Sequence, residues 1–422
     1  MKMNAMIAAL CAFILGPAPS SAWADDLRPL PQHPTFTTLS ITQFAIEGLT
    51  GDASGNLYTS GRAPVPAGAS EGPPCPVWQI QSTGIRPVTP GPYGSVPNRA
   101  PGCNLSGITF DGDGNLYIAD ANQGGVIWQL TPSNRNPTVP FATGVPGTNG
   151  LAFDRDGNLW TGDGTSGQGR VWRIRPSGGT CEPSFTGCEE VFRIQPLATV
   201  LNPSLSGGVT NVGRDVRTLP PGTIDAARAA TNTAGSQPLV VNGLAFDRDG
   251  DLFISDTARG AIWKVEFEHR GTLKSPTGCD PAFTPDTLCL DNVFVAHPYL
   301  EGADGIALDE AGNIWVDANE RNAIIVVTKE RRVAEIFRNP VNPATGLRNS
   351  NPTAGNNHIL EFPTSPFVSG TTFCTANSDG DRRDNSPRAA GEINAGGPVG
   401  TRGKISCMDQ ALTIRGLRLP VH

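Results

Sequence analysis

Short apolar stretches alternate with polar turns along the chain, and five segments repeat this pattern in one register. Each segment opens with an oxygen-bearing residue and Gly, continues through a short apolar stretch, and reaches a turn of the type Asp-x-x-Gly-Asn or a close variant. Glycine at positive φ, and Asp or Asn side chains that bond their own backbone, favour a tight turn between two strands. The pattern therefore predicts β-hairpins, and the segments begin at Glu47, Ser106, Asn149, Asn242 and Asp304.

A second strand with alternating polarity follows each turn, and a third strand is visible at residues 125–130, 170–174 and 261–265. Three strands and a fourth make one blade of a β-propeller. A weaker sixth unit lies within residues 359–375, and residues 35–44 are expected to supply the strand that closes the ring. The predicted fold class is all-β, a six-bladed β-propeller with loop insertions and disulfides.

The longest gap between repeats, from Asn149 to Asn242, contains a stretch at about 177–239 that is rich in Gly, Pro, Asn and Thr. An insertion explains this composition, and a degenerate blade is the alternative. A second region rich in Gly and Pro lies at about 379–403. Because the repeats continue on both sides of the long gap, residues 25–422 are predicted to form one propeller domain.

The N-terminus has the features of an export signal. Lys2 precedes an apolar run at residues 6–15, and Ala22-Trp23-Ala24 offers small residues at the two positions that define cleavage. The run is too short to cross a bilayer as a stable helix, and no later stretch is long and apolar enough. We expect a signal peptide at 1–24, no membrane span, and a secreted or periplasmic mature protein.

The cysteines agree with an oxidising location. Nine are present, and loss of Cys11 with the signal leaves an even number. No pair has CxxC spacing, which argues against zinc or thiol redox chemistry. Eight cysteines allow about 105 connectivities. The favoured one joins sequence neighbours, each pair closing a loop or stapling a blade: Cys75 with Cys103, Cys181 with Cys188, Cys279 with Cys289, and Cys374 with Cys407.

Composition and charge narrow the possible partners. The 50 Gly and 38 Pro suit short strands and tight turns, not long helices. The formal net charge of −7 comes without a basic stripe, so a nucleic-acid partner is not expected.

The residue before the repeated Gly is the main candidate for function. In a propeller the innermost strand of each blade borders the central channel, so equivalent positions form a ring around the axis. Glu47, Asn149, Asn242 and Asp304 would bring two carboxylates and two amides together. Such oxygen ligands suit Ca²⁺, and the absence of His and Cys from the ring disfavours zinc as the preferred ion.

Each of these residues also has a structural interpretation. Asn before Gly is a common turn pair, and Asp304 before Gly has the same ambiguity. Glu47 is a poor turn residue and is harder to explain in this way. The Asp-x-Asp-Gly-Asn turns are not expected to be EF-hands, because a strand follows at once instead of a helix. The tryptophans at repeated strand positions are expected to pack the blades: Trp128, Trp160, Trp172, Trp263 and Trp315.

The ordered set of Glu, Asn, Asn-Gly and Asp-Gly resembles the gluconolactonase and regucalcin (senescence marker protein) family of six-bladed propellers. The resemblance covers about residues 41–340. It implies metal-dependent hydrolysis, usually of a small-molecule lactone. Glu47, Asn242 and Asp304 would bind Ca²⁺ or another divalent cation such as Mg²⁺, Mn²⁺ or Zn²⁺. Asn149 would bind the ion or position the substrate.

Several features depart from the family pattern or leave the chemistry open. Leu49 stands where the family usually has Pro, and Gly150 where an acidic residue is common. Asp304 is the candidate general base toward water, with His297 or His358 as alternatives. Related propellers include paraoxonase-like lactonases and diisopropylfluorophosphatase, so phosphotriesters are also conceivable substrates.

Two other readings keep the fold and change the function. NHL-type repeats resemble these hairpins, and a secreted propeller of that kind would bind a ligand or protein at its mouth with the ion as a structural element. A strictosidine-synthase-like propeller would lose the lactonase role. Fold alone does not separate these readings from the enzyme.

Overall fold

The computed structural model describes residues 29–81, 86–122, 124–164, 168–195, 241–257, 259–268, 271–300, 302–340, 359–378 and 402–420. The predicted signal peptide, residues 196–239 of the predicted insertion, nearly all of the Gly/Pro-rich region, and His358 lie outside these residues.

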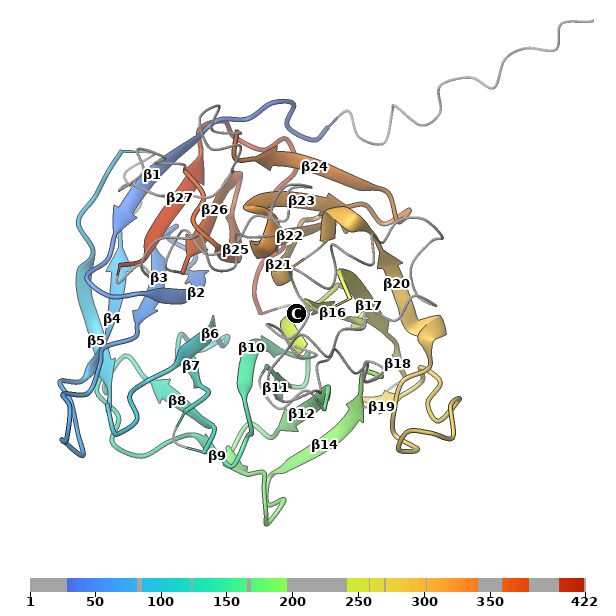
Figure 1. Cartoon of the computed structure of the whole chain (residues 1–422), viewed down its shortest axis with the longest axis horizontal. Helices are drawn as coiled ribbons and strands as arrows, with labels where there is room; N and C mark the ends of the chain where they lie inside the picture. Colours follow the sequence, from blue (N-terminus) through green and yellow to red (C-terminus); the bar gives the residue numbers. More distant parts are fainter. Residues whose placement is uncertain are drawn as a thin grey trace, which may run out of the picture.

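Six sheets of four or five strands surround a central axis, so the predicted six-bladed β-propeller is confirmed (Figure 1). The first blade consists of β2 (Ile46–Gly51), β3 (Leu57–Gly61), β4 (Cys75–Ile80) and β5 (Gly91–Val96). The second blade consists of β6 (Leu105–Phe110), β7 (Leu116–Asp120), β8 (Val126–Leu130) and β9 (Ala142–Thr143), with β13 (Gly179–Thr180) added. The third blade consists of β10 (Thr148–Phe153), β11 (Leu159–Asp163), β12 (Arg170–Ile174) and β14 (Cys188–Arg193).

The fourth blade consists of β15 (Val241–Phe246), β16 (Leu252–Asp256), β17 (Ala261–Val265) and β20 (Val293–Ala296). The fifth blade consists of β21 (Ala303–Leu308), β22 (Ile314–Ala318), β23 (Ala323–Val327) and β24 (Val333–Arg338). The sixth blade consists of β25 (Pro363–Ser369), β26 (Thr372–Asn377), β27 (Lys404–Met408) and β1 (Phe36–Ile41). A small hairpin of β18 (Phe267–Glu268) and β19 (Thr272–Leu273) and three short 3₁₀ turns, η1 (Leu290–Asn292), η2 (Pro298–Leu300) and η3 (Asn319–Arg321), lie between these strands.

The N-terminal strand completes the last blade. β1 pairs antiparallel with β27, from Phe36 opposite Met408 to Ile41 opposite Lys404. The prediction that residues 35–44 supply the closing strand is confirmed. This pairing joins two distant parts of the chain within one sheet, so the first strand of the chain completes the last blade.

The third and fourth blades are direct neighbours, which decides between the two explanations of the long gap. The backbone of Gly150 in β10 lies against the carbonyl oxygen of Asn242 in β15. No degenerate blade separates these inner strands. The range predicted for the insertion begins with β13 and β14, which belong to the second and third blades.

The predicted hairpin turns form through the first Asp of each turn. Asp154 Oδ1 accepts the backbone N–H groups of Asp156 and Asn158, each at 2.9 Å. Its Oδ2 accepts Nε1 of Trp160 at 2.8 Å, and Gly157 has φ +78°. One carboxylate therefore holds the turn and satisfies the indole N–H of a buried Trp.

Replacing Asp154 by Ala should lower the free energy of unfolding by about 3 kcal/mol, because the turn loses its acceptor and the Trp160 N–H is left unpaired. Chemical denaturation of both proteins measures this difference. Asp156→Ala is the matched control, since Asp156 is exposed in the same turn. An equal loss of unfolding free energy in both variants would contradict the role of Asp154 as the acceptor that holds the turn and Trp160.

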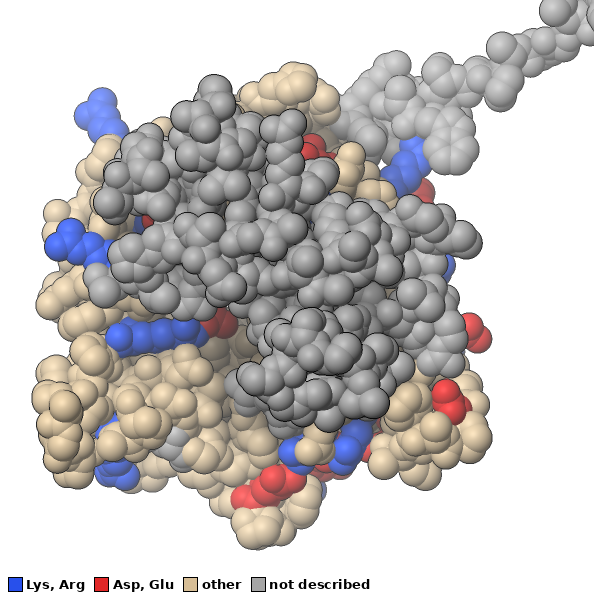
Figure 2. All heavy atoms as spheres, viewed as in Figure 1, with Lys and Arg blue, Asp and Glu red and all other residues tan. Residues whose placement is uncertain are grey.

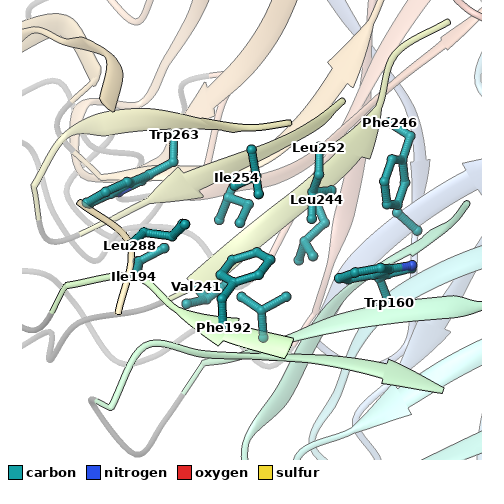
Figure 3. Packing of buried hydrophobic residues seen from close by; sticks show 13 residues of the cluster. Trp160, Phe192, Ile194, Val241, Leu244, Phe246, Leu252, Ile254, Trp263 and Leu288 are labelled. Carbon is teal, nitrogen blue, oxygen red and sulfur yellow. The ribbon is translucent and has the colours of Figure 1, made fainter. Parts of the chain in front are cut away.

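Apolar side chains from adjacent blades form the core. Between the third and fourth blades, Trp160, Phe192, Leu244 and Trp263 belong to one buried cluster (Figure 3). The five tryptophans predicted to pack the blades are at most 2% exposed. This interdigitation fixes each blade against the next and holds the inner strands at the channel.

Four disulfides form in the predicted pairing: Cys75–Cys103, Cys181–Cys188, Cys279–Cys289 and Cys374–Cys407. Four disulfides fit an extracellular location. The described residues contain no helix with the length and hydropathy of a membrane span. Acidic and basic side chains of the described residues are interspersed on the face shown in Figure 2.

Candidate metal centre

The innermost strand of each repeat is interrupted at the repeated glycine. In β15 the pairing with β16 breaks between Val241 and Leu244, and in β21 the pairing with β22 breaks between Ala303 and Ile306. The corresponding breaks occur in β2, β6 and β10. Such irregularities re-aim side chains that a regular pleat would turn into the sheet. The candidate residues sit inside these breaks.

The repeated glycines let adjacent inner strands touch. A Cβ on Gly48, Gly107 or Gly150 would lie 2.2 Å from the carbonyl oxygen of the candidate-position residue in the next blade. A Cβ on Gly243 would lie 2.7 Å from the carbonyl oxygen of Asp304, and a Cβ on Gly305 would lie 2.5 Å from that of Thr364. Only glycine fits a contact this close. The hydroxyl of Thr364 donates to the carbonyl of Glu47 at 2.8 Å and joins the sixth blade to the first.

All the candidate positions line one cavity along the propeller axis. At the end where the inner strands begin, its wall is made by Glu47, Ser106, Asn149, Asn242, Asp304 and Thr364. These six residues are called the oxygen ring below. The cavity holds about 90 Å³ of space, enough for an ion and a few water molecules. Thr364 was not predicted, because Ser365 follows it where the other repeats have Gly.

The opposite end of the cavity is apolar and is reached by the C-terminal segment. Leu417 donates its N–H to the carbonyl of Leu308, the last residue of β21, at 2.8 Å. Leu417, Leu419 and Pro420 all line the cavity. The C-terminal segment runs to the middle of the ring of blades in Figure 1. The channel thus has one oxygen-rich end and one apolar end.

Asp304 is the most buried carboxylate of the oxygen ring. Its side chain accepts Nδ2 of Asn319 at 2.6 Å, and the residue is 3% exposed. Burial raises the pKa of Asp304 well above its usual value, and the nearby Asp317 raises it further. Hydrogen bonds from Asn319 and Asn242 and the charge of Arg62 act in the opposite direction. A carboxylate held this way would gain from a bound cation.

Asp317 and Asn319 were not predicted from the sequence. Asp317 is fully buried, accepts the hydroxyl of Thr375, and has its pKa raised by burial. Its sequence signal is a carboxylate inside an otherwise apolar second strand. Asn319 is also buried, and its Oδ1 has no hydrogen-bond partner among the described residues.

Glu47 is held by a cation of its own blade. Its carboxylate forms an ion pair with the guanidinium of Arg62. Arg62 Nε also donates to the carbonyl of Leu105, at 2.9 Å, so the guanidinium spans the first and second blades. Arg62 was not predicted.

The residue after the second strand supports the oxygen ring in four blades. Arg62 pairs with Glu47, and Asn319 bonds Asp304. In the fourth blade, Asn242 Nδ2 donates to Thr257 Oγ1 at 3.2 Å. In the third blade, Gly164 leaves room for the amide of Asn149, whose Nδ2 would lie 2.7 Å from a Cβ there. This position recurs in the repeat, so the register marks these residues as neighbours of the oxygen ring, but it does not give the contacts that they make.

Ser106, the second-blade member, has a different role. Its hydroxyl donates to the carbonyl of Thr148 at 3.0 Å, which ties the second blade to the third. The four residues predicted to be ligands are therefore the two carboxylates and two amides. Among the described residues, no group of three or more His, Cys, Asp or Glu side chains is placed to hold a metal. A cation here would depend on amide oxygens, a donor set that suits Ca²⁺ better than zinc.

His297 lies in the connection from β20 to β21 and is not among the residues that line the cavity. Its Nδ1 accepts the N–H of Tyr299 at 3.0 Å, and the two rings are 4.7 Å apart. Burial and the charge of Arg321 lower the pKa of His297. The structure brings Asp304, and not His297, to the channel.

Comparison with known proteins gives one family match. The SMP-30/gluconolactonase/LRE-like region matches residues 223–347, which include Asn242 and Asp304. The predicted resemblance to this family is confirmed. Glu47 and Asn149 lie outside the matched residues. No curated protein matches the chain.

Several solved structures are similar to this propeller. The calcium-binding protein regucalcin from Agrobacterium tumefaciens has 14% identity and a TM-score of 0.46, covering 90% of this chain and 96% of its own. A putative gluconolactonase has 16% identity and a TM-score of 0.45, with 94% and 98% covered. Virginiamycin B lyase from Staphylococcus aureus has 13% identity and a TM-score of 0.40, with 88% and 98% covered.

Proposed function

We propose that the protein is an exported hydrolase that uses a divalent cation, Ca²⁺ in the first instance, to open a small-molecule lactone. The observation that carries the proposal is the lining of one channel end by Glu47, Asn149, Asn242 and Asp304. The family match to a gluconolactonase-like region supports the reaction class. The four disulfides support the extracellular location.

The donor set fits the ion. Two carboxylates and two amides supply hard oxygen ligands and enough negative charge for a divalent cation. Asp304 is desolvated, and its pKa is raised by burial, so a cation would relieve the cost of its charged form. A bound cation would act as a Lewis acid toward the lactone carbonyl.

The chain's own residues would position the reactants. Asp304 accepts a hydrogen bond from Asn319, and it is the candidate acceptor for a proton from attacking water. Asn149 would orient the substrate beside it. Below the oxygen ring, Leu151, Leu244 and Ile306 line the channel with apolar surface and exclude water from that side.

A calcium titration tests the proposal directly. Chelator-stripped protein is titrated with Ca²⁺ in a calorimeter beside the Glu47→Gln variant, and both are assayed against aliphatic and sugar lactones and a phosphotriester. We expect one site, weakened by at least about 10-fold in the variant, and lactone hydrolysis that chelator abolishes. Phosphotriester turnover alone would change the substrate class. Calcium binding without hydrolysis of any substrate would favour the non-enzymatic binding propeller.

A further inference from the structure

The ion pair between Arg62 and Glu47 places a fixed positive charge at the oxygen ring. The Arg62 backbone is held by its N–H, which donates to the carbonyl of Ala45 at 2.9 Å. Its Nε is held by the carbonyl of Leu105. The guanidinium therefore sits at the boundary of the first two blades and contacts the one ring carboxylate that Asn319 does not reach.

The first blade is distinctive in carrying a cation at this position. The equivalent residues after the second strands of the next four blades are Ala121, Gly164, Thr257 and Asn319. These side chains are neutral. Thr257 accepts a hydrogen bond from Asn242, and Asn319 donates one to Asp304, so neither adds charge to the oxygen ring. Arg62 thus alters the charge of the oxygen ring in a way that its counterparts do not.

The positive charge acts on more than Glu47. Arg62 also lowers the pKa of Asp304, on the fifth blade, through space. The Arg62 side chain is 24% exposed and the Glu47 side chain 16%, so solvent screens this charge only in part. One arginine therefore acts against the repulsion between the two carboxylates when no other cation is present.

We propose that Arg62 is a resident counter-ion of the oxygen ring, which must leave Glu47 when a divalent cation binds and so sets the affinity for that cation. The inference rests on the proposed cation site. Its physical basis is competition, because a divalent ion and a guanidinium repel each other and seek the same carboxylate oxygens. Cation binding is then an exchange of one positive group for another.

The exchange predicts opposite effects on affinity and on stability. Without the guanidinium, the ring has two uncompensated carboxylates, so the cation-free protein is less stable and the cation binds more tightly. If Arg62 only supported the position of Glu47, its loss would lower both the calcium affinity and the stability of the protein. The sign of the change in calcium affinity therefore distinguishes the two roles.

The test measures Ca²⁺ dissociation constants by calorimetry, and melting temperatures with chelator and with Ca²⁺, for wild type, Arg62→Met, Arg62→Gln and Arg62→Lys. Arg173→Met is the matched control, because Arg173 also joins a glutamate, Glu189, and a backbone carbonyl, that of Gly271, away from the channel. If a charge-removing variant is too unstable without the ion, its affinity is obtained from the calcium-loaded protein by chelator competition.

We expect Arg62→Met and Arg62→Gln to bind Ca²⁺ at least about 10-fold more tightly and to show a larger calcium-induced rise in melting temperature. Arg62→Lys should stay near wild type because it keeps the charge, and Arg173→Met should not change the affinity. Unchanged or weaker binding in both charge-removing variants would overturn the role of Arg62 and leave the cation site standing. No calcium binding by any variant would overturn both.

Discussion

Asn in place of Asp304 should weaken Ca²⁺ binding by about 100-fold or more while leaving the cation-free protein at least as stable as wild type. The substitution removes a carboxylate from the proposed ligand set. It also removes a desolvated charge, whereas the amide oxygen can still accept the hydrogen bond from Asn319. Calorimetry and thermal unfolding in chelator measure the two effects.

Asp317→Asn is the control for the Asp304 prediction. Asp317 is equally deep in the fifth blade and has its pKa raised by burial, yet it does not line the channel. Its substitution should change calcium affinity by less than about 3-fold, since Asp317 is not a proposed ligand and would act only through its charge. Similar losses of affinity in both variants would contradict the assignment of Asp304 as a ligand. Normal calcium binding with full turnover in Asp304→Asn would exclude Asp304 as the base.

Ala in place of Gly150 should lower the free energy of unfolding by about 3 kcal/mol or more. The added Cβ would lie 2.2 Å from the carbonyl oxygen of Asn242 and 2.9 Å from the side chain of Leu244. The nearest atom is backbone on a packed neighbouring strand, so the third and fourth blades must separate to make room. Calcium affinity should fall as well, because Asn149 and Asn242 would move apart.

Gly91→Ala separates crowding at the ring from a general effect of losing a glycine. A Cβ at Gly91, in β5 of the first blade, would meet nothing closer than the Gln79 carbonyl oxygen at 3.6 Å. We expect a change within about 1 kcal/mol. Equal destabilisation by both variants in denaturant titrations would show that contact between inner strands does not determine stability.

The hairpins and the oxygen ring could be predicted because short, repeated segments of the sequence specify both. Glycine and Asx residues specify each turn over five positions, and repetition places Glu47, Asn149, Asn242 and Asp304 in register. In a propeller, residues at the same register position of each blade lie together around the central axis. The same logic failed for Thr364, since its strand lacks the Gly that marks the others.

The partners of the ring residues depend on contacts that the local pattern does not encode. Arg62 reaches Glu47 from the end of the next strand, and Asn319 reaches Asp304 from a 3₁₀ turn. Leu417 meets Leu308 through a long-range backbone hydrogen bond. A polar or apolar residue near a strand end fits many positions equally well, so its partner follows only once the blades are placed.

The pairing of β1 with β27 has a consequence for the timing of synthesis. β1 ends at Ile41 and β27 begins at Lys404, so roughly 360 residues separate the partners, or roughly 20–70 s at about 5–20 residues per second. Until then the backbone of β1 and the side chains of Phe36 and Leu39 lack their final neighbours. A strand in that condition pairs readily with strands of other chains. The yield of folded protein should therefore depend on how the first strand is shielded while the last blade is being made.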